Sequence, residues 1–394
     1  MKSNGSYVKY LHKSKRWSAF VMMLFIPWLL GSQTASWDLK CILDNKLQHS
    51  SGILTLNQGQ TFWSQVDNSS PAELYEMDVN CNILRTVKII GVSKTDWEDI
   101  ATDFKGSIYL GDFGNNNNSR NDLKIYILKD IANQPGDSMR PELIQFNYQN
   151  QTAFPPAAAY RNFDMEAMIW YQDTLHLFSK NRTDPFTGFT YQYKIPAVSG
   201  TYSVSPVDSF KTGDGPDVFF WITGAAFNPI DTELILLSHD RLWKFSGFDG
   251  SRFFSGKNSL ITLPTYSQKE GICYAKENTW YVTDEYFSTL RIGGNLYEMK
   301  LEPTKNQEPV DEFEFEVYPN PAQTFLEIFI PKINSDKSDP FILYDALGSI
   351  LIQTRIDKMR TFIPIEHLVN GVYFIKTYSR KLNRFIVKRV LKVD

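Results

Sequence analysis

The chain has 394 residues, 42% of them apolar and 22% charged, which is the composition of a globular protein with a full core. Its length fits two or three domains. The formal net charge of −3 becomes −8 once the five basic side chains of residues 1–35 are removed. A chain this acidic is not a nucleic-acid binder by bulk electrostatics. Aromatic residues reach 14%, and because they favour strands we expect mainly β structure.

Residues 1–36 have the pattern of a signal peptide. Basic side chains between Lys2 and Arg16 precede an apolar run, Trp17–Leu30, and small residues follow it. The alternative is a retained membrane anchor. The run is shorter than the roughly 20 residues that span a bilayer, and Pro27 interrupts it. We therefore expect cleavage and a mature chain without a transmembrane segment.

A repeated unit follows over residues 37–302. Each unit opens with a strand and continues, after a short turn, with a second and a third strand. The five opening segments are Ser51–Leu56, Asp96–Ala101, Asp164–Ile169, Trp221–Ala226 and Gln268–Cys273. Four short strands at a period of roughly 45 residues or more are typical of a β-propeller blade. We expect an all-β propeller of five blades, or of six if a long interval hides another blade. A pair of β-sandwiches is the alternative architecture.

The last unit runs out after its third strand, near Glu302. A propeller must close its ring, and a missing strand is often supplied by the other terminus. Trp37–Leu43 looks like a strand without a partner. We therefore predict that this segment completes the last blade.

The chain has three cysteines, so at most one internal disulfide can form. A bond between Cys41 and Cys81 is conceivable, but spacing alone does not fix the pairing. Cys273 lies in an apolar strand and reads as a small buried residue.

Acidic residues recur at the start of the opening strands. Glu98, Glu166 and Glu270 come from three different units and would ring the central channel, and Asp112 ends a second strand in an oxygen-rich loop. Carboxylates that converge in this way could hold a divalent cation, with Ca²⁺ favoured in an all-oxygen site. The structural alternative is that these acids, and Asp99 beside them, accept N–H groups of neighbouring blades.

Other candidate sites are weaker. His239 at a second-strand end could act in acid–base chemistry or be a hydrogen-bonded turn residue. Aromatic residues in the third unit could stack on sugars or face the blade core. They are Phe186, Phe189, Tyr191 and Tyr193.

A polar, proline-containing linker at residues 303–313 separates the repeats from a tail, residues 314–394. The tail reads as seven short strands, which suggests a small Ig-like β-sandwich. Short motifs follow one another in the tail: Tyr318-Pro319-Asn320-Pro321, then Asp345 and Gly348, then Asn370-Gly371 with Tyr373, and finally Lys388.

This ordered set resembles the type A C-terminal sorting domain of the type IX (Por) secretion system. The resemblance covers about a fifth of the chain. It implies a Bacteroidota source, export through the periplasm to the cell surface or medium, and the type IX machinery as a partner. It also implies possible anchoring to surface polysaccharide. More loosely, residues 50–300 resemble uncharacterised exported propellers and, distantly, phytase-like and lactonase-like propellers.

Two functions remain open from the sequence. The first is a non-catalytic propeller that binds a glycan, peptide or partner protein. The second is a metal-dependent hydrolase of lactonase or phosphoesterase type that uses the channel carboxylates. No nucleophile elbow, zinc-protease or phosphate-loop motif is present in the sequence.

Overall fold

The computed structural model describes residues 35–67, 71–301, 315–330, 339–379 and 384–394. In this part of the chain strands dominate, and the helical structure consists of short 3-10 turns: η1 (Asn45–Leu47), η2 (Ala158–Tyr160), η3 (Asp217–Phe219) and η4 (Phe253–Ser255). The predicted linker and most of the predicted signal peptide lie outside the described residues. Among the described helices, none has the length and apolar character needed to cross a membrane.

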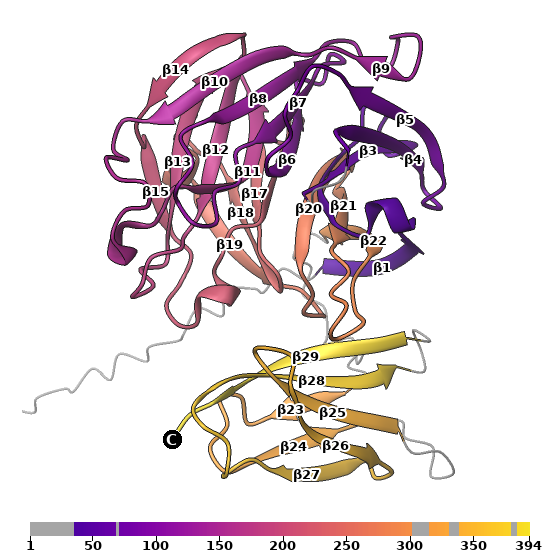
Figure 1. Ribbon diagram of the computed structural model, residues 1–394. Helices are drawn as coiled ribbons and strands as arrows, with labels where there is room; N and C mark the ends of the chain where they lie inside the picture. The colour runs from indigo at the N-terminus through magenta and orange to yellow at the C-terminus, as the bar shows by residue number, and fades with distance from the viewer. Residues whose placement is uncertain (1–34, 68–70, 302–314, 331–338, 380–383) are drawn as a thin grey trace, which may run out of the picture. The chain divides into compact units, whose positions relative to one another are not determined.

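The repeats form five sheets, each with one strand innermost in the ring and the others following outward (Figure 1). Blade 1 contains β2 (Ser50–Leu54), β3 (Thr61–Val66), β4 (Glu73–Asp78), β5 (Ile83–Ile89) and β9 (Ser138–Met139). Blade 2 contains β6 (Trp97–Thr102), β7 (Ile108–Asp112), β8 (Leu123–Leu128), β10 (Glu142–Tyr148) and β14 (Gly200–Val204). Blade 3 contains β11 (Asp164–Tyr171), β12 (Thr174–Lys180), β13 (Phe189–Pro196) and β15 (Asp208–Lys211).

The last two blades complete the set. Blade 4 contains β16 (Gly224–Asn228), β17 (Glu233–Leu237), β18 (Arg241–Ser246) and β19 (Lys257–Thr262). Blade 5 contains β20 (Lys269–Lys276), β21 (Thr279–Asp284), β22 (Asn295–Leu301) and β1 (Ala35–Ile42). Each innermost strand contacts the innermost strands of both neighbouring blades, and β20 contacts β2. The sheets therefore close into a five-bladed ring, and the two-sandwich alternative is wrong.

The six-blade alternative is also wrong for the described residues. The long intervals instead hold β9 and β14, which pair in parallel with the outer strands β5 and β10. The chain thus widens two blades rather than adding one. The fifth blade takes its outermost strand from the N-terminal side, because β1 pairs antiparallel with β22 from Ala35↔Leu301 to Ile42↔Asn295. The predicted closing strand is confirmed, and it begins two residues earlier than expected.

The inner strands approach one another closely. A Cβ on Gly224 would lie 2.2 Å from the carbonyl oxygen of Glu270 in the next blade, so no larger residue fits there without a backbone shift. Apolar side chains fill the space between adjacent blades. Trp63 and Trp97 lie in one such layer, and Trp243 and Phe253 in another. The blade cores thus explain the high aromatic content.

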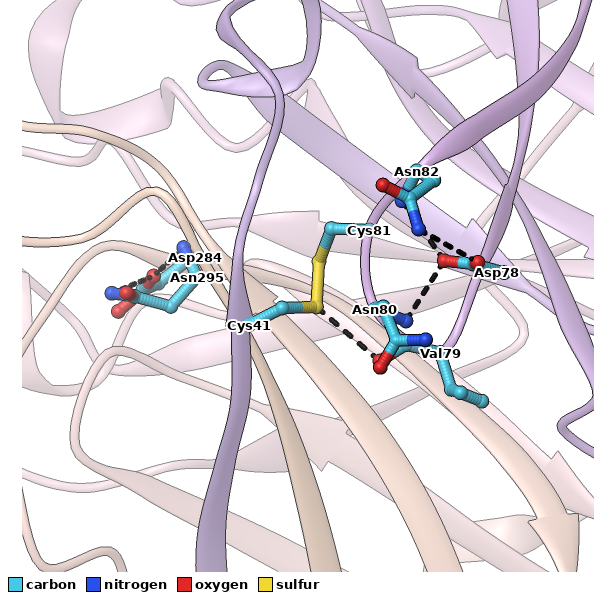
Figure 2. The surroundings of a disulfide bond; sticks show 8 residues. All are labelled: Cys41, Asp78, Val79, Asn80, Cys81, Asn82, Asp284 and Asn295. Carbon is cyan, nitrogen blue, oxygen red and sulfur yellow. Dashed lines mark hydrogen bonds between the residues drawn. A yellow bond between two sulfur atoms is a disulfide. The ribbon is translucent and has the colours of Figure 1, made fainter.

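A disulfide joins the closing strand to the first blade (Figure 2). Cys41 lies on β1, and Cys81 lies in the turn between β4 and β5. The carboxylate of Asp78 shapes that turn by accepting the backbone N–H groups of Asn80 (2.8 Å) and Asn82 (2.9 Å). Cys81 itself has a positive φ of 65° in this turn, and its sulfur bonds to that of Cys41 on β1. The bond that the spacing left open is present, and Cys273 is a free, buried cysteine.

The tail forms two sheets around a separate apolar core that includes Leu326, Phe341 and Ile375. One sheet contains β23 (Glu316–Tyr318), β24 (Phe325–Phe329) and β27 (Arg360–Pro364). The other contains β26 (Ile350–Ile356), β25 (Asp339–Asp345), β28 (Gly371–Ser379) and β29 (Arg384–Lys392). The predicted seven strands are therefore present as a two-sheet sandwich.

Candidate functional site

The channel of the ring has two different ends. At one end, residues from all five innermost strands surround a cavity of about 40 Å³, enough for only a few water molecules. Ile53, Ile100, Met168, Ala225 and Ile272 are among its lining residues. This end is apolar and offers little to a polar ligand.

The opposite end collects charged groups, and strand register explains why. In each blade the start of the innermost strand pairs with the end of the second strand, as Trp97 does with Asp112 and Asp164 with Lys180. Polar residues at both positions therefore meet at one mouth of the channel. The buried charged side chains in this group are Glu98, Asp99, Asp112, Asp164, Glu166, Lys180, Lys269, Glu270, Asp284 and Glu285.

Glu98 is one of the predicted ligands, and it is buried there. Its carboxylate accepts the hydroxyl of Ser51 from blade 1 (3.2 Å). Burial raises the pKa of Glu98 well above its ordinary value, and the nearby charge of Glu166 adds to this. Gly114 fits against this carboxylate, since a Cβ would lie 2.3 Å from Glu98 Oε1. Glu98 thus belongs to a closely packed group of acidic side chains.

Glu166 has basic partners rather than a vacant ligand face. Lys180 Nζ lies 3.0 Å and Arg182 Nη2 3.4 Å from Glu166 Oε1. Burial raises the pKa of Glu166 to about 8, although Lys180 opposes that rise. Arg182 also pairs with Asp164 at 2.7 Å and lies 4.6 Å from the ring centre of Trp221. An acid, two cations and an aromatic face therefore adjoin at the mouth.

The two aspartates of blade 2 have structural partners. Asp112 accepts the backbone N–H groups of Thr95 (3.1 Å) and Asp96 (3.0 Å) and a charged hydrogen bond from Arg120 (2.9 Å). Asp99 accepts the backbone N–H of Met168 in blade 3 at 2.7 Å. The structural interpretation from the sequence therefore holds for Asp99, and Asp112 orders the entry to β6.

Glu270 belongs to the same network, since its charge interacts with those of Glu98, Glu166 and Lys180. Burial raises its pKa well above the ordinary value, and the charge of Glu285 is the next cause. Beside it is the one group of three possible metal ligands found among the described residues: His49, Asp67 and Glu285, with one ligand atom of each within 4.8 Å of the others. Glu98, Glu166, Glu270 and Asp112 do not form such a group in the described part of the chain. The geometry thus gives no support to a cation held by those four residues.

His239 is buried at the same end. Its Nδ1 lies 3.2 Å from the Tyr266 hydroxyl, and burial lowers its pKa well below the ordinary value. The imidazole therefore stays neutral near pH 7 and is poorly suited to acid–base catalysis at that pH. Of the aromatic residues singled out in the sequence, Tyr193 is fully buried in a blade core, in agreement with the alternative of core packing.

A second feature, which the sequence did not predict, is a groove of about 470 Å³ on the loops of blade 3. Residues 150–163 form one side and residues 183–191 the other. Its lining residues are Asn150, Thr152, Ala153, Pro156, Ala157, Ala159, Tyr160, Asn162, Phe163, Thr183, Thr187 and Tyr191. The lining is aromatic, hydroxyl, amide and small apolar in character, and it contains no charged residue.

The groove is preformed, because its two loops are tied by backbone hydrogen bonds. Arg182 N donates to Arg161 O (2.9 Å), and Asp184 N donates to Ala158 O (3.1 Å). The side chain of Asn118 fixes the base by accepting the N–H of Phe163 at 2.8 Å. The sequence signal for this groove is Tyr191, one of the aromatic residues of the third unit that could stack on sugars.

In the tail, the motif residues stabilise turns and edges of the sandwich. Asn320 forms two hydrogen bonds with the backbone of β29, to Arg389 O and from Leu391 N (both 2.9 Å). Asp345 accepts the N–H of Ser349 at 2.8 Å in a turn where Gly348 has a φ of 83°. Each of these motif residues therefore has a local structural task.

The remaining motif residues follow the same pattern. The hydroxyl of Tyr318 accepts a hydrogen bond from Arg360 (2.6 Å), and that of Tyr373 donates to Val369 O (2.7 Å). Lys388 contacts both the carbonyl and the ring of Phe315. Pro319 and Pro321 flank Asn320, and Asn370-Gly371 leads into β28.

Comparisons with known proteins fit this division. Residues 316–392 match the family described as "Secretion system C-terminal sorting domain". The tail is a type IX sorting domain. It implies export of the chain to the cell surface or the medium, and handling by the type IX machinery. No curated protein matches this chain in sequence.

Solved structures with a similar course of the chain include three of note. The PQQ-bound aldose sugar dehydrogenase of Streptomyces coelicolor is 11% identical, covers 69% of this chain and 100% of its own, and has a TM-score of 0.44. The gluconolactonase XC5397 of Xanthomonas campestris is 10% identical over 69% of this chain and 92% of its own, with a TM-score of 0.37. PorZ, a surface component of the type IX system of Porphyromonas gingivalis, is 11% identical over 88% of this chain and 45% of its own, with a TM-score of 0.31. At these scores we draw nothing from them about ligand or activity.

Proposed function

We propose that this protein is a surface-displayed or secreted propeller that binds a glycan in the groove of blade 3. The sorting domain supplies the destination, and the propeller supplies the recognition. We also infer that export begins with removal of residues 1–36, in a bacterium of the Bacteroidota, and that anchoring to surface polysaccharide is one possible end state.

The observation that carries this proposal is the chemistry of the groove lining. Its volume of about 470 Å³ is in the range of small-molecule sites. Tyr160 is 71% exposed, and Tyr191, near the start of β13, lines the groove from the other side. Neutral hydroxyl and amide groups, such as Thr152 and Asn150, suit the hydroxyls of a sugar better than a charged peptide side chain. Because hydrogen bonds already hold the two loops in place, little conformational entropy of the loops is lost on binding.

A glycan array probed with the mature full-length protein tests this proposal. We expect binding to a limited set of neutral glycans, and a loss of roughly tenfold or more in affinity for Tyr160→Ala, about 1.4 kcal/mol. Phe362→Ala is the matched control, because Phe362 is a 59% exposed aromatic in the sorting domain. Equal binding by both variants, or no glycan binding by a folded wild type, would exclude the groove as a glycan site.

A second candidate function is hydrolysis at the channel mouth. It rests on Glu166, whose pKa of about 8 keeps it protonated near pH 7, beside the cations Lys180 and Arg182. A protonated acid next to positive charges could protonate a leaving group while an anionic substrate binds. Generic lactone and phosphoester substrates test this function. It requires turnover that Glu166→Gln abolishes, and absence of turnover in the wild type would exclude it.

A further inference from the structure

We propose that His49, Asp67 and Glu285 form a binding site for one divalent transition-metal ion, of the Zn²⁺ or Mn²⁺ class, at the junction of blades 5 and 1. This site is independent of the glycan groove. One ligand atom of each residue lies within 4.8 Å of the others, a spacing that a single ion can bridge with little adjustment.

The three side chains come from three different segments that the fold holds together. His49 precedes β2, Asp67 follows β3, and Glu285 follows β21. The backbone N–H of Tyr286 donates to Gln48 O at 2.7 Å, so the segment of Glu285 is fixed beside that of His49. The N–H of Asp67 points to His49 O at 3.4 Å. Backbone hydrogen bonds at or beside the three ligand residues therefore hold their segments next to one another.

Donor chemistry favours a transition metal over Ca²⁺. The set contains one imidazole nitrogen and two carboxylates, a combination that suits Zn²⁺ and Mn²⁺, whereas Ca²⁺ prefers oxygen ligands only. The His49 Nδ1 already lies 3.1 Å from Glu285 Oε1. An ion would replace that hydrogen bond and neutralise the two carboxylates.

Accessibility and surrounding charge are also suitable. The His49 side chain is 46% exposed, which leaves a path for the ion, while that of Glu285 is 11% exposed. Glu270 lies close enough for its charge to interact with both Glu285 and Asp67. An additional carboxylate beside the set makes the local field more negative and favours a cation. Glu270, a ligand in the sequence-based prediction, would thus support the site from its edge.

Because the ligands span blades 1 and 5, the ion would join the two blades at the closure of the ring. A ligand that binds the folded chain but not the unfolded chain stabilises the folded state. At a zinc concentration of about 100 times Kd we expect the melting temperature to rise by roughly 5 °C or more. This readout does not depend on any activity.

The test uses the mature full-length protein, stripped with a chelator and titrated with ZnCl₂, MnCl₂ and CaCl₂ by calorimetry and thermal melting. We expect one bound Zn²⁺ or Mn²⁺ per chain, and at least tenfold weaker binding for His49→Ala and for Glu285→Gln. His367→Ala is the control, since His367 is an exposed histidine of the sorting domain. Its binding should equal that of the wild type. Melting of each metal-free variant confirms that it is folded.

Three results would overturn the proposal. The first is no binding of Zn²⁺ or Mn²⁺ by the folded wild type at about 100 μM metal, a concentration of the order used to detect weak sites. The second is binding that both site variants retain, which would place the ion elsewhere. The third is a preference for Ca²⁺, which would contradict the role of the imidazole nitrogen.

Discussion

Removal of the disulfide between Cys41 and Cys81 should destabilise the propeller substantially. The bond closes a loop with a sequence separation of 40 residues. In the chain-entropy treatment, a loop of that length restricts the unfolded chain by about 4 kcal/mol at 25 °C. For a domain of this size, each kcal/mol shifts the melting temperature by about 2–4 °C, so we expect a fall of roughly 10 °C in the Cys41→Ser/Cys81→Ser double variant.

The assay is thermal melting of the mature chain, with two internal checks. Reduction of the wild type should reproduce the double variant, because both remove the same covalent link. Cys273→Ala is the control. It leaves the disulfide intact and removes only a small buried side chain, which costs about 1 kcal/mol. A thiol count on the unfolded, unreduced wild type should give one free cysteine per chain.

The same experiment reports where the bond acts. Because Cys41 lies on β1, hydrogen exchange in β1 and in its partner β22 should accelerate more than exchange in β11 or β16. A double variant that melts within about 2 °C of the wild type would refute the reasoning. It would mean that the link does not constrain the unfolded chain as its loop length requires.

Three further predictions follow from other parts of the chain. Gly224→Ala should lower the free energy of unfolding, measured in urea, by about 2–4 kcal/mol, because its Cβ would lie 2.2 Å from Glu270 O. Gly247→Ala, which has open space around it, should lower that free energy by only about 1 kcal/mol. Similar losses in the two variants would contradict the close approach of the blades. Burial raises the pKa of Asp96 from 3.8 to about 6, so its favourable contribution is complete below pH 3.8 and is lost as the pH rises through 6. Asp96→Asn should therefore gain stability over the wild type between pH 4 and pH 7, by about 2 kcal/mol after allowance for partial exposure, and a difference independent of pH would count against this. Deletion of residues 314–394 should leave the propeller in the periplasm, as fractionation and blotting would show, and surface exposure of that truncated chain would contradict the role of the tail.

Most of the architecture could be predicted from the sequence, because every blade repeats the same pattern of short strands and turns. Apolar strands separated by short turns recur in every unit. The absence of a fourth strand near Glu302 pointed to the segment around Trp37 as the closing strand. The edge strands β9 and β14 were not readable. They are two to five residues long and pair in parallel with strands that are distant in the sequence. No local alternation of apolar and polar residues therefore predicts these two strands.

The site was harder to predict, for reasons of long-range geometry. Acidic residues at strand starts were visible, but their partners depend on register. Lys180 meets Glu166 because the end of β12 pairs with the start of β11. His49 lies outside the repeated segments, and it meets Glu285 only after the ring has closed. Such a pair, 236 residues apart in sequence, carries no local signal.

Ring closure therefore links the disulfide, the closing strand and the proposed metal site. If residues 1–36 are removed as predicted, β1 is shortened to Trp37–Ile42 and becomes the terminal strand of the chain, and strands at a terminus are the first to fray. Cys41 lies near the far end of β1 and ties it to blade 1, and disulfides of this kind persist in exported proteins. Loss of β1 would expose the edge of β22, which is a template for pairing with another chain. An ion held by His49, Asp67 and Glu285 would join the same two blades at the channel mouth. The junction of blades 5 and 1 thus depends on the N-terminal segment, and this gives a physical reason for a covalent link and a metal link to lie there.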